Sequence, residues 1–197
     1  MKFTRILFPA IISITPVAVY ISNPFDVPTE NVRPRILGHD IYRIPSKSML
    51  STLAPSDYII ISNIAYRKEM PKRRDIIVFK RVSKKDNDKT IPYIKRVIAI
   101  AGDIIKIQQG LVSINNEPLK EDYINPENKQ SPYSQFQPER TVPDGMIFVL
   151  GDNRDNSSDS RVFGFVPVSD VIGQATTLII GKNKALLSSP MKMLSKR

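Results

Sequence analysis

The sequence predicts a mainly β protein. Seven short segments after residue 57 are rich in Ile and Val, which favours strands over helices. Pro, Asp, Asn and Gly bound these segments, as expected for strands that are joined by tight turns. No long amphipathic helix, internal repeat or heptad pattern is found in the sequence. The predicted strands are residues 58–64, 76–82, 93–100, 104–107, 111–114, 146–150 and 171–180.

Composition limits the possible chemistry. The chain has 197 residues, enough for one domain with a small subdomain. It contains no Cys, which excludes disulfides and thiolate chemistry, and its single His, His39, excludes a His-cluster metal site. A serine enzyme built from this chain would therefore more readily use a lysine as its base. The net charge of +10 has no phosphate-binding loop or RNA-binding motif beside it, so it favours a membrane surface over nucleic acid.

The N-terminal segment predicts a membrane anchor over residues 1–22. Residues 6–21 are apolar and uncharged, and Lys2 and Arg5 precede them. This run is short for a bilayer, which needs roughly 20 residues, and a cleaved signal peptide is the alternative. Residues 17–22 lack a clear pair of small residues for cleavage, so a retained anchor is favoured. The basic flank predicts a cytoplasmic N-terminus and an extracytoplasmic domain.

The rest of the chain divides by composition. Residues 23–40 contain three prolines and predict a tether, and residues 41–181 form the β-rich domain. Within this domain, residues 104–145 begin with a hairpin around Gln109-Gly110 and continue as a polar, Pro-rich stretch that suits a subdomain or a surface excursion. Residues 182–197 are basic and either lie on a membrane or form a frayed tail, which their internal proline favours.

The segment from Ile44 to Leu50 carries two serines two residues apart. Pro45 fixes its own φ and pushes the residue before it towards an extended backbone. If the extended backbone continues, Ser46 and Ser48 project from the same side of the chain. Two neighbouring hydroxyls suit a nucleophile and an oxyanion donor, and a polar turn is the simpler alternative.

The predicted strand 93–100 places a lysine among apolar residues. In a strand, Lys95 shares a face with Tyr93, Val97 and Ala99. Burial among these residues would lower the pKa of Lys95 and supply a neutral amine, as a general base requires. A surface lysine is the alternative.

A polar loop follows the predicted strand 146–150. Its sequence is Gly151-Asp152-Asn153-Arg154-Asp155-Asn156-Ser157-Ser158-Asp159-Ser160-Arg161. So many Asp, Asn, Ser and Arg residues predict a network of ion pairs and hydrogen bonds. The spacing does not match an EF-hand loop, which needs Gly at its sixth position and Glu at its twelfth. A solvated loop or a weak cation site is the alternative.

These segments, in this order, resemble the signature motifs of type I signal peptidases. The matching stretches are Pro45-Ser46-Lys47-Ser48-Met49, Arg74-Asp75-Ile76-Ile77-Val78-Phe79, Tyr93-Ile94-Lys95-Arg96 with Gly102-Asp103, and the whole of the polar loop. The resemblance covers about residues 42 to 175. It implies an antiparallel-sheet catalytic core with a small β cap insertion, preceded by one N-terminal transmembrane helix.

The resemblance also implies a Ser/Lys dyad. Ser48 would be the nucleophile and Lys95 the general base, with no metal or cofactor. Ser46 and the backbone N–H of Ser48 would form the oxyanion hole, and Ser157 would orient the Lys95 amine.

Further roles follow from the same resemblance. Asp159 and Arg161 would support the site through a salt bridge. Shallow pockets would accept small residues at −1 and −3 of the substrate, and their lining residues would be Ile44, Met49, Leu53, Tyr93 and Ile94.

Three features depart from the family pattern. Ser51 stands where Pro is usual, Arg74 stands where Gly is common, and the segment between Asp103 and Gly151 is short, which predicts a reduced cap. These departures leave the subfamily open, and a specialised relative that matures conjugative pilin is one alternative.

The predicted function is a single-pass serine endopeptidase of the cytoplasmic membrane, with its catalytic domain on the extracytoplasmic side. Its expected partners are signal peptides of exported preproteins and membrane lipid, and not nucleic acid. A self-cleaving SOS-type repressor uses a related Ser/Lys site, but it needs a helix-turn-helix where this chain has an apolar run. A non-catalytic, membrane-anchored binding module is the other alternative, and the intact Ser48, Lys95 and Ser157 disfavour it. No oligomeric state is predicted.

Overall fold

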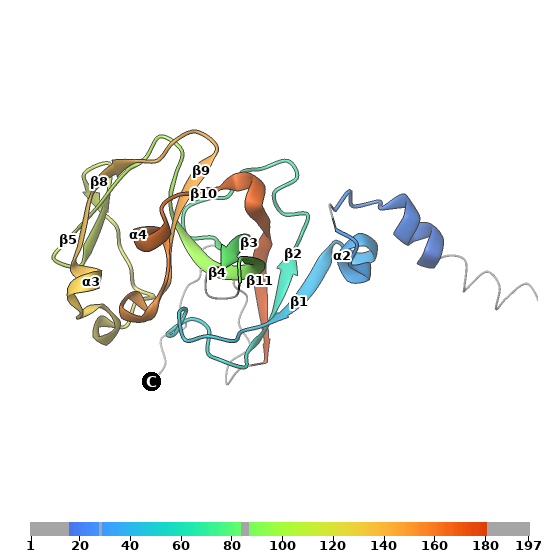
Figure 1. The fold of residues 1–197 in the computed structure, drawn as a ribbon, viewed down its shortest axis with the longest axis horizontal. Coiled ribbons are helices and arrows are strands. Elements are labelled where there is room, and N and C mark those ends of the chain that lie inside the picture. Colours follow the sequence, from blue (N-terminus) through green and yellow to red (C-terminus); the bar gives the residue numbers. More distant parts are fainter. Residues whose placement is uncertain (1–15, 28, 84–86, 181–197) are drawn as a thin grey trace, which may run out of the picture.

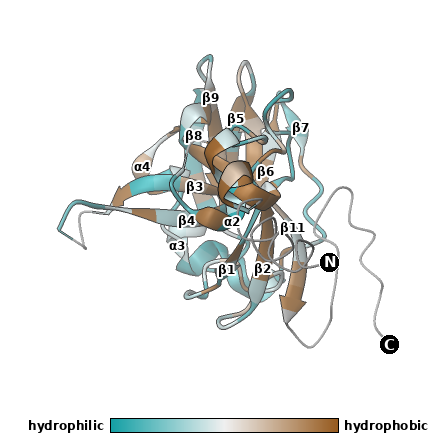
Figure 2. Ribbon diagram, turned by 90° about the vertical axis from the view of Figure 1, so that its right-hand side faces the viewer, coloured by the Kyte–Doolittle hydropathy of each residue, from teal (hydrophilic) through white to brown (hydrophobic). Residues whose placement is uncertain are grey.

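The computed structural model describes residues 16–27, 29–83 and 87–180. This part of the chain forms two antiparallel sheets of unequal size, joined side by side (Figure 1). The predicted mainly β class is therefore confirmed. Hydrophobic residues concentrate on the strands and hydrophilic residues on the connections (Figure 2).

The large sheet has seven strands in the order β1-β2-β11-β3-β4-β9-β10, and each neighbouring pair is antiparallel. β3 and β4 are long neighbours whose hairpin extends out from the body of the domain (Figure 2). The strands are β1 (His39–Arg43), β2 (Tyr58–Ser62), β3 (Ile76–Ser83), β4 (Lys89–Ile100), β9 (Met146–Leu150), β10 (Val166–Pro167) and β11 (Val171–Ile180).

The small sheet has four strands in the order β7-β6-β5-β8. Its central hairpin turns at Gln109 and Gly110, which have φ of 51° and 72°, so the predicted hairpin is found. The four strands lie within residues 104–145. They are β5 (Ile104–Gln108), β6 (Leu111–Ile114), β7 (Glu117–Pro118) and β8 (Phe136–Thr141).

The helices are short and lie in the connections between strands. α2 precedes β1, α3 precedes β8, and α4 begins at the end of the polar loop that follows β9. Residues 16–22 are also helical. The short helices are α2 (Val32–Leu37), η2 (Pro126–Lys129), α3 (Pro132–Gln135), η3 (Arg154–Asn156), α4 (Ser160–Phe163) and η4 (Val168–Asp170).

The centre of the large sheet is covered on both faces. Along β3, Ile76 and Val78 pack in one core cluster, whereas Ile77 and Phe79 pack in another. Because side chains alternate along a strand, these two clusters lie on opposite faces. A strand buried on both faces reads as a continuous apolar run, which is why β3 is conspicuous in the sequence.

A third core cluster joins the two sheets. Ile98 and Ala99 from β4 and Phe148 and Leu150 from β9 belong to it. Their partners come from the small sheet and the segment after it, and they are Ile105, Ile107, Val112, Ile114 and Val142. The small sheet is thus packed against β4, which carries Tyr93-Arg96, and against β9, which the polar loop follows.

The segment predicted as a tether, residues 23–40, is folded against the domain where the structure describes it. It contains α2, which ends at Gly38 with φ 69°, and it buries Val27 and Pro34. Arg33 pairs with Asp40 at 3.0 Å. These residues are therefore folded locally, with Pro34 inside α2, and their role as a tether stays a prediction.

The predicted transmembrane helix falls mostly outside the described residues. Within the described ranges, no helix is both long enough and apolar enough to cross a membrane. The structure does not describe residues 1–15 of the predicted anchor. The predicted tail, residues 182–197, also lies outside the described residues.

Candidate active site

The segment that carries the two serines forms a turn. Leu50 N–H donates to the Lys47 carbonyl at 3.1 Å, and Leu53 N–H donates to the Met49 carbonyl at 2.8 Å. The predicted continuation of the extended backbone is therefore wrong beyond Pro45. Met49 and Leu53 are buried in the core. The packing of these two side chains fixes the turn that follows the second serine.

The two serine hydroxyls nevertheless lie close together. Ser46 Oγ and Ser48 Oγ are 3.2 Å apart, which is within hydrogen-bonding distance. Ser48 is almost fully buried, whereas Ser46 is exposed. The turn, rather than a strand, produces the proximity.

Lys95 reaches Ser48 from β4. Its Nζ lies 2.8 Å from Ser48 Oγ and 2.7 Å from the backbone carbonyl oxygen of Ile94. The lysine is only 3% exposed, so water has little access to its amine. The alternative of a surface lysine is therefore excluded.

Burial sets the protonation of this amine. Desolvation lowers the pKa of Lys95 to about 8, although the negative charges of Asp159 and Asp152 raise it in part. Both carboxylates are engaged elsewhere, with Arg161 and Arg96. In the part of the chain that the structure describes, no carboxylate forms an ion pair with Lys95, so desolvation decides the direction.

The surroundings of Lys95 differ in one respect from the prediction. The amine lies 5.6 Å from the centre of the Tyr93 ring, and Tyr93 and Val97 pack in the same cluster, as expected for one strand face. Ala99 belongs instead to the cluster between the sheets, because a register shift between Val97 and Ala99 turns the strand. The predicted contribution of Ala99 to this face is wrong.

The polar loop after β9 lies directly against the serine turn. Asn153 N–H donates to the Ser48 carbonyl and Asn153 Nδ2 donates to the Lys47 carbonyl, both at 3.1 Å. Gly151 has no space for a side chain, because an added Cβ would lie 2.4 Å from the Ser48 carbonyl oxygen and 2.2 Å from Ser157 Oγ. The loop thus holds the backbone of the residue that carries the candidate nucleophile.

Ser157 is placed near the site but not as predicted. Its Oγ is buried and has no hydrogen-bond partner among the described residues. The expected bond to Lys95 is not formed, since the Lys95 amine is bound to Ser48 and to the Ile94 carbonyl. An unpaired buried hydroxyl is costly and often marks a functional position.

The predicted salt bridge within the loop is present. Asp159 binds Arg161 through two contacts of 2.7 and 2.8 Å, and both side chains are buried. Asp159 also accepts a hydrogen bond from Gly151 N–H at 3.1 Å, and Arg161 donates to the Arg154 carbonyl at 2.7 Å. The pair therefore connects the end of the loop to its beginning, through Gly151 and Arg154.

Comparison with known proteins now identifies the family. The profile of the family described as "Signal peptidase, peptidase S26" matches residues 39–180, most of the chain. The chain belongs to this signal peptidase family. The match includes β1, the serine turn, β4 and the polar loop, and so contains every residue of the candidate site.

Curated relatives agree with this placement in the signal peptidase family. Over 135 residues, or 67% of this chain, it is 40% identical to the probable signal peptidase I-1 of Synechocystis and 42% identical to the signal peptidase I of Leptolyngbya laminosa. It is 34% identical to the signal peptidase I of Bacillus caldolyticus over 68% of the chain and 75% of the relative. The matches span 66% and 64% of the lengths of the two cyanobacterial relatives.

Both single-residue departures from the signal peptidase motifs have unusual backbone conformations. Ser51 and Arg74 have φ of 90° and 78°, in the left-handed region that favours glycine. This explains why Gly suits the position of Arg74. The arginine side chain adds a contact that Gly cannot make, a 2.7 Å hydrogen bond from its Nη2 to the Lys120 carbonyl.

The predicted pocket residues lie beneath the serine turn. Four of them belong to a single core cluster and are at most 8% exposed: Ile44, Met49, Leu53 and Ile94. Tyr93 is half-buried next to the Lys95 amine. These apolar side chains belong to the core next to Ser48, and their contact with substrate stays a prediction.

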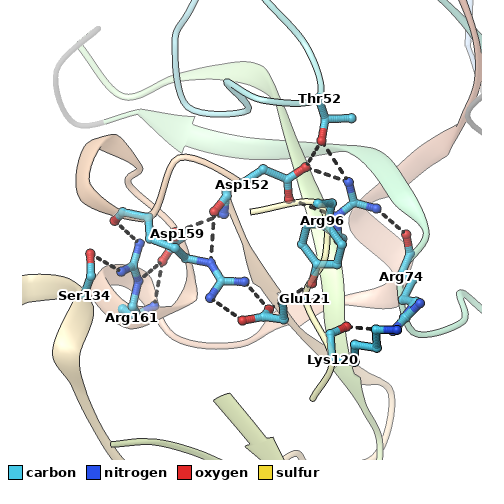
Figure 3. A network of polar contacts seen from close by, with 12 residues as sticks. Thr52, Arg74, Arg96, Lys120, Glu121, Ser134, Asp152, Asp159 and Arg161 are labelled. Carbon is cyan, nitrogen blue, oxygen red and sulfur yellow. Dashed lines mark hydrogen bonds and ion pairs between the residues drawn. The ribbon is translucent and has the colours of Figure 1, made fainter. Parts of the chain in front are cut away.

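A polar network that includes the Asp159–Arg161 pair extends beyond Ser48 and Lys95 (Figure 3). Arg96 binds Asp152 through contacts of 2.6 and 2.9 Å, and the same carboxylate accepts a hydrogen bond from Thr52. Arg154 forms a buried ion pair with Glu121. The loop was predicted to form such a network, but Glu121 was not, because it lies in a polar stretch without periodicity 33 residues before its partner.

His39 offers no competing base at the serine. It begins β1, opposite Ser62, and its Nδ1 lies 2.9 Å from the Leu37 carbonyl. Its neighbour Asp40 is paired with Arg33 rather than with the imidazole. Among the described residues, no group of three or more His, Asp or Glu side chains is arranged to hold a metal ion.

Proposed function

We propose that this protein is a membrane-anchored serine endopeptidase that removes signal peptides from exported preproteins, with Ser48 as nucleophile and Lys95 as general base. The observation that carries the proposal is the 2.8 Å contact between Ser48 Oγ and a buried Lys95 amine whose pKa is lowered to about 8. Membership of the signal peptidase family supports the class of substrate.

Acylation begins with a neutral Lys95. Its nitrogen accepts the Ser48 proton while Ser48 Oγ attacks the carbonyl carbon of the scissile bond. The oxyanion that forms is stabilised by the Ser46 hydroxyl and the Ser48 N–H. When the tetrahedral intermediate collapses, the C–N bond breaks and the Lys95 ammonium returns a proton to the leaving amine. The mature protein leaves, and the signal peptide stays bound to Ser48 as an ester.

Deacylation uses the same amine. Neutral Lys95 takes a proton from a water molecule, whose oxygen attacks the ester carbonyl carbon. The ester bond to Ser48 Oγ breaks, and the proton returns from Lys95 to Ser48. The free signal peptide is released with a new carboxyl group, and the enzyme is restored.

The contacts of Lys95 suit this role. A neutral amine has two N–H donors and one lone pair, and a carbonyl oxygen can only accept. One N–H therefore goes to the Ile94 carbonyl, 2.7 Å away, which leaves the lone pair free to face the Ser48 hydroxyl. The second N–H is available for Ser157, whose buried Oγ has no hydrogen-bond partner among the described residues and lies against Gly151. We assign Ser157 this orienting role, with Asp159 and Arg161 as its support.

Substrate choice is assigned to the apolar core next to Ser48. Ile44, Met49 and Ile94 are packed in one core cluster, and we expect them to limit the size of the side chains at −1 and −3 of the substrate. Close-packed sites tolerate overfilling poorly, so a preprotein with Leu at −1 is expected to resist cleavage that its Ala counterpart undergoes. Equal cleavage of the two would remove these residues from the specificity site.

The anchor is assigned to residues 1–22, with the N-terminus in the cytoplasm. The apolar run and the basic residues that precede it support this topology. Protease added to intact spheroplasts is expected to digest the domain after residue 22. Protection of the domain would reverse the orientation, and a mature N-terminus close to residue 23 would show that the segment is a removed signal.

Catalysis is tested most directly with a purified preprotein that has Ala at −3 and −1. The wild-type protein is expected to cut once after the −1 residue, as mapped by mass spectrometry of both fragments. Ser48→Ala, purified in the same way, is the matched control and is expected to be inactive. Cleavage by both proteins would indicate a contaminating protease, and no cleavage by either would refute the proposed activity.

A further inference from the structure

A short segment after the small sheet is bound to the catalytic part of the domain by three arginines. This segment, residues 120–123, follows β7 and is called the latch here. Arg74, from the loop before β3, donates to the Lys120 carbonyl at 2.7 Å. Arg96, from β4, places its guanidinium 4.0 Å from the centre of the Tyr123 ring. The third arginine, Arg154 of η3, forms the ion pair with Glu121.

The ion pair between the latch and the polar loop is deeply buried. The side chains of Arg154 and Glu121 are 3% and 6% exposed. Two N–H groups of Arg154 face the two carboxylate oxygens, one of them at 3.0 Å. Tyr123 O–H donates to the same carboxylate at 2.9 Å. Such a charge-assisted, two-point contact is strong and directional, so it fixes where the arginine side chain lies.

Charge balance makes Glu121 necessary to this arrangement. The buried network holds two arginines, Arg96 and Arg154, and two carboxylates, Asp152 and Glu121. Asp152 is already shared by Arg96 and Thr52. Without Glu121, one buried guanidinium would lose its counter-ion, and an unpaired buried charge is strongly unfavourable.

Arg154 transmits this constraint to the nucleophile. Its Nε donates to the Gly151 carbonyl at 3.2 Å, while its other nitrogens are held by Glu121. Gly151 is the residue whose Cα lies against both the Ser48 carbonyl and Ser157 Oγ, with no space for a methyl group. A shift of the Gly151 peptide would therefore displace Ser48 or Ser157.

We propose that Glu121 is a positioning residue for catalysis: through Arg154 it holds the Gly151 peptide in place and so sets the position of Ser48 relative to Lys95. The latch thus couples the small sheet to the catalytic geometry, although it contributes no group that touches the dyad. The inference deepens the proposed peptidase function and rests on it for its kinetic readout.

The first test is Glu121→Gln in the full-length protein. The amide keeps the shape of the side chain but removes the charge that matches Arg154. We expect kcat to fall about tenfold or more, because small displacements of reacting groups are costly, with KM changed by less than about twofold. Hydrogen exchange, followed by mass spectrometry, is expected to quicken in residues 151–157. Glu69→Gln is the matched control, since it breaks an exposed ion pair with Lys72, and it should change neither readout.

A double variant separates positioning from stability. Glu121→Leu with Arg154→Met removes both charges and fills the space with apolar side chains, a change that often preserves or raises stability. No group then binds the Gly151 carbonyl. We expect a melting temperature near that of the wild type together with the low kcat of Glu121→Gln. Recovery of kcat along with stability would show that the pair is only structural and would overturn the proposal.

The remaining outcomes are also decisive. If Glu121→Gln does not fold, the double variant supplies the kinetic comparison. If Glu121→Gln has the kcat and the hydrogen exchange of the wild type, the latch does not position the loop. If the wild type cleaves no preprotein, the proposed function fails, and hydrogen exchange in residues 151–157 still tests the latch, with unchanged exchange overturning it.

Discussion

Two adjacent basic residues of β4 are buried in opposite electrostatic surroundings. The Lys95 amine contacts a serine hydroxyl and a backbone carbonyl, and no carboxylate pairs with it within the described ranges. Arg96 is held by both oxygens of Asp152, by the Arg74 carbonyl and by the ring of Tyr123. Burial alone lowers the pKa of both residues, but Asp152 keeps the pKa of Arg96 above its ordinary value, whereas Lys95 falls to about 8.

The difference separates two uses of a buried cation. Arg96 has its charge matched, so it serves to fix Asp152 and the beginning of the polar loop. Lys95 lacks a direct counter-ion, so its charged form is disfavoured and it can exchange a proton near neutral pH. Alternation along the strand makes this possible, because neighbouring side chains point to opposite faces. One strand therefore supports both the proposed chemistry and the scaffold that holds it.

The comparison is tested most severely by Lys95→Arg. This change gives position 95 the permanently charged group that position 96 carries, and a guanidinium cannot accept the Ser48 proton. Turnover of a preprotein substrate is expected to fall by about 10⁴-fold, the upper range for loss of a general base. Near-normal turnover would mean that a group other than Lys95 acts as the base.

Ser46→Ala removes a proposed oxyanion donor but leaves the Lys95 amine in place. It therefore separates the loss of oxyanion stabilisation from a change in the pKa of Lys95. Removal of one oxyanion donor typically lowers kcat by roughly 10²–10³-fold, and we expect a loss of this size with little change in KM. Because Ser46 contacts Ser48 Oγ rather than the amine, the pH at which the rate levels off should not move. An unchanged kcat would limit Ser46 to a structural role in the turn.

The pH dependence of kcat/KM reports the protonation of Lys95 and not that of Arg96. Only the neutral amine is active, so protonation lowers the rate, and the profile should rise with pH, reach half of its plateau near pH 8 and level off above it. At pH 6 about 1% of the amine would be neutral, and the rate should be about 100-fold below the plateau. Arg96 stays charged throughout and contributes no step. A rise centred above pH 10 would mean that Lys95 is not desolvated in solution.

The parts of this arrangement that the sequence could predict are those with a local signal. The apolar runs of β9 and β11 stand between turn residues, and both strands have the bounds that their pattern predicts. Ser48 and Lys95 stand out because their motifs occur in a characteristic order, although they are 47 residues apart. β1 was missed because it is an edge strand of mixed polarity, with His39, Asp40 and Arg43 among its five residues.

The latch could not be predicted, because its signal is not local. Glu121 and Tyr123 lie in a polar stretch that reads as surface loop, yet both side chains are buried against arginines from distant segments. Their burial depends on the packing of the small sheet on β4 and β9. Charge pairing across such distances follows from tertiary structure, and it is what distinguishes Arg96 from Lys95.

The smallest expected effect is also the clearest contrast between the two neighbours: the same substitution should change stability in opposite directions. Arg96→Met leaves Asp152 buried without its ion-pair partner, which is expected to cost about 3–5 kcal/mol. Lys95→Met removes a buried amine whose charged form is destabilised by burial. The difference between a pKa of about 8 in the folded protein and the ordinary 10.5 means that Lys95→Met should raise the free energy of unfolding by up to about 3 kcal/mol at pH 7.

The pH dependence of that gain follows from linkage. Below pH 8 the lysine is protonated in both the folded and the unfolded protein, so the gain from Lys95→Met is complete. Between pH 8 and about 10.5 the folded protein has released the proton and the unfolded chain still binds it, so the wild type becomes more stable as pH rises and the gain shrinks. Melting temperatures of the purified proteins at pH 7 and pH 10 test both signs. We expect Lys95→Met to melt several degrees above the wild type at pH 7 only, and Arg96→Met to melt on the order of 10 °C below it at both pH values. If Lys95→Met were destabilising at pH 7, the buried amine would be better paired than its contacts with Ser48 and Ile94 indicate.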